Sequence, residues 1–268
     1  MNFPNYLKVI RQAGKHYFTL KQAMSDLNLS ANATLAAIHR LRARGDLISP
    51  AKGLYVIVPP EYQPQGSIPA EELVPILMHH LKADYYVSLL SGAQYYGASH
   101  QKPGCFQIIS NKRVKHPLVF GQVKIELIFK KTVDELPTQN VTVRTGYLKV
   151  ATPELIAFDL LSYLSRSGGL NHIATVFSEL IEAIDIDKII QLADKLGEKT
   201  WLQRLGYILE QLDPMDKEKV EFIIFKLQQY LNEKMKVFAP LAPELPKIGC
   251  PRIKKWMIIA NTDIESDL

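Results

Sequence analysis

Small and basic residues share one face of a predicted helix near the N-terminus, where they are suited to contact DNA. On a helical wheel of residues 30–44, Leu35, Ile38 and Leu41 fall on one side and would pack on the preceding helices. The other side carries alanines, which let a backbone approach a groove, and arginines, which offer a bidentate fork to guanine or a charge to phosphate. We therefore expect the DNA contacts to come from Lys21, Ser30, Asn32, Ala33, Ala36, His39, Arg40, Arg42, Arg44 and Lys52.

The elements that must hold this helix follow the order helix, helix, turn, helix, hairpin. Thr19 with Gln22 predicts a capping box for the second helix, and Ser30 predicts the N-cap of the third. This order is typical of a winged helix-turn-helix, with Lys52 at the tip of the wing. The helices are predicted at residues 4–13, 20–27 and 30–44, and the strands at 47–49 and 54–58.

Net charge is +5 and is unevenly distributed along the chain. Residues 1–60 hold eight Lys and Arg against two Asp and Glu, and residues 100–150 hold nine against three, whereas the rest of the chain is mildly acidic. Two basic blocks of this kind indicate a polyanionic partner. The second block includes Lys112, Arg113, Lys115, Lys130 and Lys131.

This second basic block allows two interpretations. Its charges either discourage pairing at a strand edge or form a surface for nucleic acid or a partner. Alternation along a strand would place Lys130 and Lys131 on opposite faces, so that not all of the block could form one patch.

Downstream of the winged helix, the pattern predicts an α+β fold. A proline-rich linker at residues 61–69 separates the domain at 1–60 from a larger mixed α/β domain at 70–268, with a small central sheet and a helical C-terminal half. Within the larger domain, helices are predicted at about 70–82, 87–97, 153–166, 171–183, 185–196, 199–211 and 216–232, and strand-like runs at 105–110, 119–129, 141–150 and 256–259.

Enzymatic motifs are absent from the sequence. No phosphate-binding loop, dinucleotide fingerprint, nucleophile elbow or zinc-protease motif occurs. A nuclease would need clustered carboxylates, and only Glu126 lies on the central strands, with Asp84, Glu154 and Asp159 as possible companions. We therefore expect no catalytic residue, no metal site and no cofactor.

The composition also indicates a cytoplasmic protein. Apolar residues make up 47% of the chain and charged residues 22%, as in ordinary soluble proteins. No signal peptide precedes the first helix, and no apolar run is long enough to span a membrane. The two cysteines, Cys105 and Cys250, lie far apart and suit a reducing compartment.

Several runs of the sequence resemble the AbiEi-type antitoxins of bacterial type IV toxin–antitoxin systems. They consist of packing and capping residues, so they indicate a family without marking a site. The resemblance extends over nearly the whole chain and rests on Gly53–Val56, Tyr86–Ala93, Thr152–Leu155, Asp159–Leu161 and Gly168–Val176.

The resemblance implies two activities. A protein of this family would repress its own operon by binding inverted repeats upstream of it in double-stranded DNA. Its C-terminal domain would counteract a nucleotidyltransferase-type toxin, without forming a stable complex with it. The winged helix provides residues for the first activity, whereas no short motif locates the second, for which we take the second basic block as a hypothesis.

Three other functions remain open from the sequence. A ligand-responsive winged-helix regulator without a toxin partner would need a ligand pocket. A DNA-targeted nuclease or transferase would need acidic residues gathered beside the central strands. A docking module would lack salt-dependent affinity for DNA. Repressor binding as a dimer or as a cooperative pair of monomers fits the sequence equally well.

Overall fold

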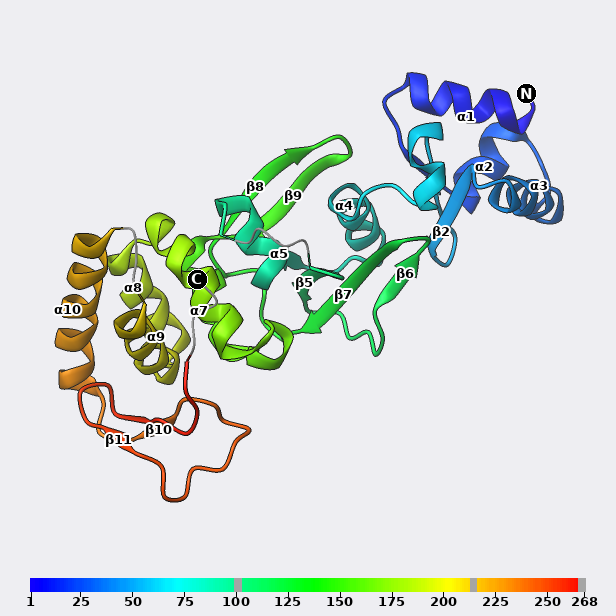
Figure 1. The fold of residues 1–268 in the computed structure, drawn as a ribbon. Coiled ribbons are helices and arrows are strands. Elements are labelled where there is room, and N and C mark those ends of the chain that lie inside the picture. The colour runs from blue at the N-terminus through cyan, green and yellow to red at the C-terminus, as the bar shows by residue number, and fades with distance from the viewer. Residues whose placement is uncertain (99–102, 213–215, 265–268) are drawn as a thin grey trace. The chain divides into compact units, whose positions relative to one another are not determined.

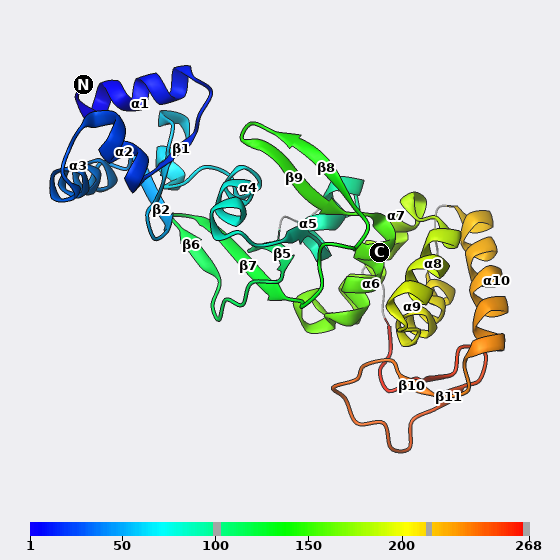
Figure 2. The same cartoon turned by 180° about the vertical axis from the view of Figure 1, so that it is seen from behind.

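The chain folds into two units built from alternating segments of the sequence. Figures 1 and 2 show its helices and strands from opposite sides. The structure is a computed structural model and describes residues 1–98, 103–212 and 216–264. The predicted linker at 61–69 lies inside the first unit. The first unit comprises Met1–Tyr86, Gly104–Glu135 and Asn140–Lys149, and the second comprises Val87–Pro103, Leu136–Gln139 and Val150–Leu268.

The first unit begins with a winged helix-turn-helix arrangement. Its helices lie within one or two residues of their predicted positions, and it also contains a strand, β1, that the sequence analysis missed. Strand β1 pairs antiparallel with β3, which also pairs with β2, so that the sheet has the order β1-β3-β2. The elements are α1 (Phe3–Gln12), β1 (Tyr17–Thr19), α2 (Leu20–Leu27), α3 (Ala31–Ala43), β2 (Leu47–Ala51) and β3 (Leu54–Ile57).

Local signals define both ends of α2 and the start of α3. The Thr19 hydroxyl accepts a hydrogen bond from Gln22 N at 3.3 Å, and the Gln22 side chain accepts from Thr19 N at 2.8 Å, which completes the predicted capping box. Asn28 ends α2 in the left-handed conformation, with φ of 52°. The Ser30 side chain then accepts a hydrogen bond from Ala33 N at 3.3 Å and caps α3 as predicted.

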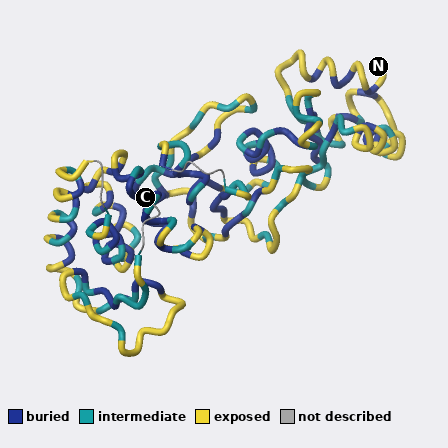
Figure 3. The backbone as a smooth tube through the Cα atoms, in the orientation of Figure 1, coloured by how far each residue is buried: buried dark blue, intermediate teal, exposed yellow. Residues whose placement is uncertain are grey.

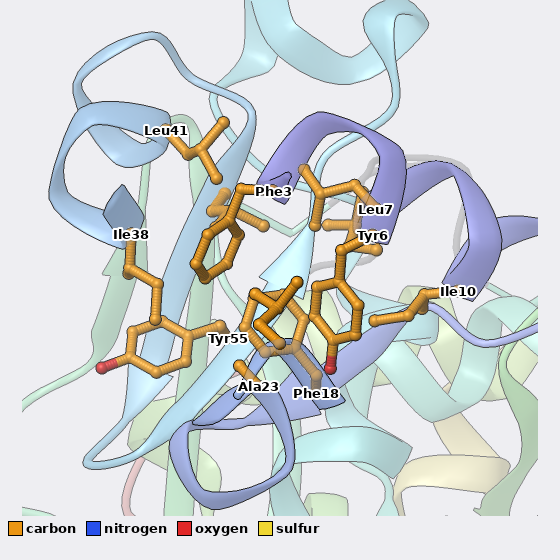
Figure 4. Close-up of a cluster of buried hydrophobic side chains, with 12 residues drawn as sticks. Phe3, Tyr6, Leu7, Ile10, Phe18, Ala23, Ile38, Leu41 and Tyr55 are labelled. Atoms are coloured by element: carbon orange, nitrogen blue, oxygen red, sulfur yellow. The ribbon is translucent and has the colours of Figure 1, made fainter. Parts of the chain in front are cut away.

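An aromatic cluster packs these helices on the sheet (Figure 4). The ring of Phe18 is 1% exposed and lies 5.5 Å from that of Tyr6 and 5.6 Å from that of Tyr55, measured between centroids. The Tyr6 hydroxyl donates to Asp26 at 3.0 Å and so ties α1 to α2. Burial, and then this bond to a carboxylate, raise the pKa of Tyr6.

A six-stranded mixed sheet follows the winged helix, after the short helix η1 (Pro60–Gln65) and α4 (Ala70–Leu81). The strand order is β6-β7-β5-β4-β9-β8, with β5 parallel to β7 and β6 antiparallel to β7. The division between the two units runs through β4, β8 and β9. The strands are β4 (Tyr85–Val87), β5 (Phe106–Ser110), β6 (Leu118–Phe120), β7 (Val123–Phe129), β8 (Thr138–Val143) and β9 (Gly146–Ala151).

Two strand-like runs that were predicted as single strands are each divided by a turn. In 119–129, the break comes at Gly121, with φ of 56°, where an added Cβ would lie 2.2 Å from the Gln65 carbonyl oxygen. Only glycine fits this approach, and Gln122 N donates to the same carbonyl at 2.8 Å. In 141–150, the chain turns at Arg144 and Thr145, between β8 and β9.

The helix predicted at 87–97 is also wrong at its start. Val87 is the last residue of β4 and pairs with Val150 of β9. The chain leaves the sheet at Ser88, and α5 (Leu89–Ala93) begins at Leu89 with φ of 54°. Apolar periodicity does not distinguish a short buried strand from a buried helix, which explains the error.

The second unit is mainly helical, as predicted. Helix α6 is almost wholly buried, and its two buried carboxylates are bonded: Glu154 accepts from Asp185 N at 3.1 Å and Asp159 accepts from the Ser88 hydroxyl at 2.8 Å. Together with the sheet, these helices confirm the predicted α+β class. They are α6 (Pro153–Ser162), α7 (Gly169–Leu180), α8 (Ile186–Leu196), α9 (Thr200–Gln211) and α10 (Lys217–Lys234), with single turns η2 (Gln94–Tyr96), η3 (Leu164–Arg166) and η4 (Ile181–Ala183).

The C-terminal segment is fastened to α9. The Gln203 amide donates to the carbonyls of Val237 and Met257, both at 3.0 Å, and the Trp256 ring fills the space that a side chain at Gly206 would occupy. Between Val237 and Trp256, residues 243–249 form an exposed loop (Figure 3). Three short strands complete the segment: β10 (Ala239–Pro240), β11 (Arg252–Ile253) and β12 (Ile258–Ile259).

In the parts of the chain that the structure describes, no helix combines the length and apolarity needed to cross a membrane.

Candidate nucleic-acid interface

Helix α3 presents a continuous exposed surface of the expected kind. Its N-cap Ser30 lies at one end and Arg44 at the other, and Lys52 lies in the turn between β2 and β3. Every residue that the sequence placed at the DNA is exposed: Lys21, Ser30, Asn32, Ala33, Ala36, His39, Arg40, Arg42, Arg44 and Lys52.

The buried side of α3 differs from the predicted one at Leu35. Thr34, Ile38 and Leu41 are buried, whereas the Leu35 side chain is 42% exposed. Positions 34, 38 and 41 follow the spacing i, i+4, i+7 of one helix face, and successive residues lie about 100° apart, so that Leu35 turns toward the exposed side. The Thr34 hydroxyl donates to the Ser30 carbonyl at 2.9 Å, which allows a polar side chain in this core position.

Arg44 at the end of α3 has a local partner. Its Nε lies 3.2 Å from the Asp46 carboxylate, and its side chain remains 69% exposed. Exposed ion pairs of this type contribute little to stability and are readily exchanged for another anion. Arg44 therefore remains accessible to a phosphate group.

The wing is held by two contacts that the sequence did not reveal. His80, near the end of α4, donates from Nε2 to the Lys52 carbonyl at 3.1 Å, and Leu20 N donates to the Gly53 carbonyl at 3.0 Å. Gly53 has φ of 75°, which a turn of this kind requires of glycine. Both contacts use the backbone of the wing, so the Lys52 side chain is free to extend away from it.

The second basic block is brought together at one edge of the six-stranded sheet. Because β5 and β7 are parallel, their carboxyl ends lie at the same edge, with Ser110 opposite Phe129. We call this group of charges the strand-end basic cluster. It consists of Lys112, Arg113 and Lys115 after β5 and of Lys130 and Lys131 after β7.

The sequence predicted that Lys130 and Lys131 point to opposite faces of a strand, but the strand ends before both residues. Strand β7 stops at Phe129, so the alternation of a pleated strand does not extend to the two lysines. Lys131 is exposed, and Lys130 is half-buried with its amine 3.5 Å from the Tyr86 hydroxyl.

The carboxylates considered for a nuclease are engaged in structural bonds. In the first unit, Asp84 accepts from the Asn111 amide at 2.9 Å and Glu126 accepts from the Gln107 amide at 3.3 Å. In the second unit, Glu154 and Asp159 hold the bonds described above. Among the described residues, no group of three or more His, Cys, Asp or Glu side chains is placed to hold a metal ion.

A hollow of about 470 Å³ lies between α1 and the end of α3. Charged side chains contribute much of its wall, whereas pockets for small ligands are mostly apolar with a few placed polar groups. Its lining consists of Pro4, Leu7, Lys8, Arg11, Gln12, Leu41, Arg44 and Asp46.

Comparisons with known proteins found a similar family and a similar solved structure. Residues 86–211 match the family model described as the AbiEi antitoxin C-terminal domain. No curated protein matches the chain. A crystal structure of the RV2827C protein from Mycobacterium tuberculosis has the same fold, with a TM-score of 0.64 and 15% identity, over 94% of this chain and 89% of that one.

The family match includes most of the runs on which the resemblance was based, among them Tyr86–Ala93 and Gly168–Val176. The predicted resemblance is confirmed there, and it supports an antitoxin role in a toxin–antitoxin system. Over residues 86–211, the chain is therefore similar to the C-terminal domain of the AbiEi antitoxins.

Proposed function

We propose that this protein is a type IV antitoxin that also represses its own operon. Its winged helix would bind inverted repeats in double-stranded DNA upstream of the operon. The rest of the chain would counteract a nucleotidyltransferase-type toxin without a stable complex between the two. Both tasks belong in the cytoplasm, and neither uses a cofactor or a catalytic residue.

The observation that carries the DNA-binding part is the two-sided construction of α3. One side is fixed in the core by Ile38 and Leu41, which are 2% and 6% exposed. The other side exposes Arg40 beside alanines, which present no bulk to a groove. A helix held in this way enters the major groove as a rigid body, so its arginines meet base edges and phosphates in a fixed register.

A mobility-shift assay with the DNA upstream of the gene tests this part. We expect sequence-specific binding by the wild type that weakens steeply with salt, because cations on the protein displace counterions from the phosphates. Arg40→Ala/Arg44→Ala should lower the affinity by tenfold or more, since one bidentate arginine contact contributes about 1–3 kcal/mol.

The matched control is Lys247→Ala/Lys254→Ala, which removes the same charge from exposed positions of the C-terminal segment. It should bind like the wild type. Equal binding by the arginine variant, or the absence of specific binding to this DNA, would leave the winged helix as a docking module.

We further propose that the strand-end basic cluster is the antitoxic surface. The support is its position. Five cations share one sheet edge in the first unit, and this part of the first unit lies within the segment that matches the AbiEi model. Lys112→Glu/Arg113→Glu/Lys115→Glu should abolish rescue of cells that express the toxin, while Lys236→Glu/Lys247→Glu/Lys254→Glu should not. Full rescue by the first variant would contradict this assignment.

A further inference from the structure

The strand-end basic cluster is anchored at a single buried residue, Ser110. Its carbonyl accepts a hydrogen bond from Lys130 N at 2.9 Å, and its hydroxyl oxygen accepts one from Lys112 N at 3.1 Å. The same hydroxyl donates to the Asp84 carbonyl at 2.7 Å. The two basic runs therefore leave the sheet from adjoining points on the backbone, although they are 18 positions apart in the sequence.

Four of the five cations at this edge have no direct acidic partner among the described residues. Within the described ranges, no ion pair joins a carboxylate to Lys112, Arg113, Lys115 or Lys131. Asp84, the acidic residue at the anchor, accepts a hydrogen bond from the Asn111 amide and forms no ion pair with these cations. Like charges gathered at one edge repel one another, and an anion that spanned several of them would relieve the repulsion.

An exposed aromatic ring lies within the cluster. The Arg113 guanidinium carbon is 4.1 Å from the centre of the Phe129 ring, and the Phe129 side chain is 38% exposed. The ring therefore supports the guanidinium from one side. A planar guanidinium held in this way offers its own plane to a second flat group.

Bases in a single strand expose their faces, whereas the bases of a duplex are stacked on one another and covered. Proteins that bind single strands combine a basic path for the phosphates with aromatic or guanidinium planes for the bases. Helix α3, in contrast, has arginines and alanines on its exposed side and no Phe, Tyr or Trp, which suits the groove of a duplex.

We propose that the strand-end basic cluster binds single-stranded nucleic acid, with a base stacked on the Arg113–Phe129 pair and phosphates on the neighbouring lysines. The inference deepens the proposed function, since it rests on this cluster being the antitoxic surface. The antitoxin would then act through a nucleic acid and would need no stable complex with the toxin.

The test measures fluorescence anisotropy of labelled single-stranded RNA and DNA of mixed sequence with the full-length protein. The strands exceed the about 4–16 nucleotides that one such site covers. All variants carry Arg40→Ala/Arg44→Ala, which silences α3. Lys112→Ala/Arg113→Ala/Lys115→Ala should weaken binding at least tenfold and make the salt dependence shallower, by about 0.7 in the logarithmic slope for each phosphate that the variant no longer neutralises.

Two conservative variants separate stacking from charge. Arg113→Lys keeps the charge and loses the plane, and Phe129→Leu keeps the packing and loses the ring. Both should weaken binding about threefold or more with the salt slope unchanged. The charge-matched control, Lys236→Ala/Lys247→Ala/Lys254→Ala, should bind like its parent, and unchanged thermal unfolding midpoints would show that the variants fold.

Three results would overturn the inference: no binding of either strand, binding that the triple substitution leaves unchanged, or no effect of both conservative variants. Equal affinity for a duplex without the operator sequence would overturn the single-strand assignment as well. A preference between RNA and DNA identifies the natural ligand. If Lys112→Glu/Arg113→Glu/Lys115→Glu loses rescue from the toxin while the protein binds neither strand, the inference fails and the proposed antitoxic surface stands.

Discussion

Helix α3 and the strand-end basic cluster both present cations, but different structures hold them. In α3, one continuous helix positions every charge, and its ends are defined by Ser30 and by the turn after Arg44. In the cluster, the charges follow two separate strands and meet because β5 and β7 pair in parallel. The first surface therefore depends on packing beneath one helix, and the second on hydrogen bonds between segments distant in sequence.

This difference suggests how each surface fails. Removing a core side chain below α3 should release the whole helix, because the charges move as one body. Removing a bond at Ser110 should disturb only the loop that carries Lys112, Arg113 and Lys115, because the strands themselves remain paired.

The largest expected effect comes from the core of the winged helix. Ile38→Ala should lower the free energy of unfolding by about 2–5 kcal/mol, because it removes a buried side chain and leaves a cavity. Leu35→Ala is the matched control on the same helix: its side chain is 42% exposed, so the cost should be well below that of Ile38→Ala. Denaturant unfolding measures both, and equal costs would show that α3 is not held as described.

A smaller effect is expected at the anchor of the cluster. Ser110→Ala leaves the Asp84 carbonyl and Lys112 N without their partner, which should cost about 1–3 kcal/mol. Hydrogen exchange at Lys112 N should accelerate, while exchange along α3 stays unchanged. The control Ser25→Ala, at an exposed position of α2, should neither lower the stability nor accelerate exchange at Lys112 N. Unchanged exchange at Lys112 in the Ser110 variant would contradict the role of this serine.

Loss of the α3 cap should come next. Ser30→Ala removes the acceptor for Ala33 N, and such a cap contributes about 1 kcal/mol. The free energy of unfolding should fall by this amount. Affinity for the operator should also fall, because the first turn frays. A variant as stable as the wild type would show that packing alone defines the start of the helix.

The smallest effect concerns pH. Burial, and then the charge of Arg144, lower the pKa of His16, so folding favours its neutral form. The stability that this provides is complete above the ordinary histidine pKa and is lost as the pH falls below about 6.5 toward the lowered value. As the pH falls through this range, the free energy of unfolding should decrease more steeply in the wild type than in His16→Gln. Identical slopes would contradict the assignment.

The sequence predicted α3 and its exposed surface well because the signals are local. A cap, a helical periodicity and a following glycine lie within 16 residues, and hydrogen bonds between neighbours in sequence express them directly. It misplaced Leu35, since a wheel of apolar residues does not foresee that Thr34 satisfies its hydroxyl at the Ser30 carbonyl and takes the buried position.

The cluster shows the opposite case. The sequence contained its five basic residues, but the strand-end geometry that joins them depends on which strands become neighbours. The pairing of Ser110 with Phe129, the stacking of Arg113 on that ring and the contact of His80 with the wing join residues far apart in the chain. Composition and local pattern alone determined the winged helix, the α+β class and the two basic blocks. Only the tertiary structure decided that five residues of the second block follow two neighbouring strand ends, because long-range strand pairing leaves no trace in local periodicity.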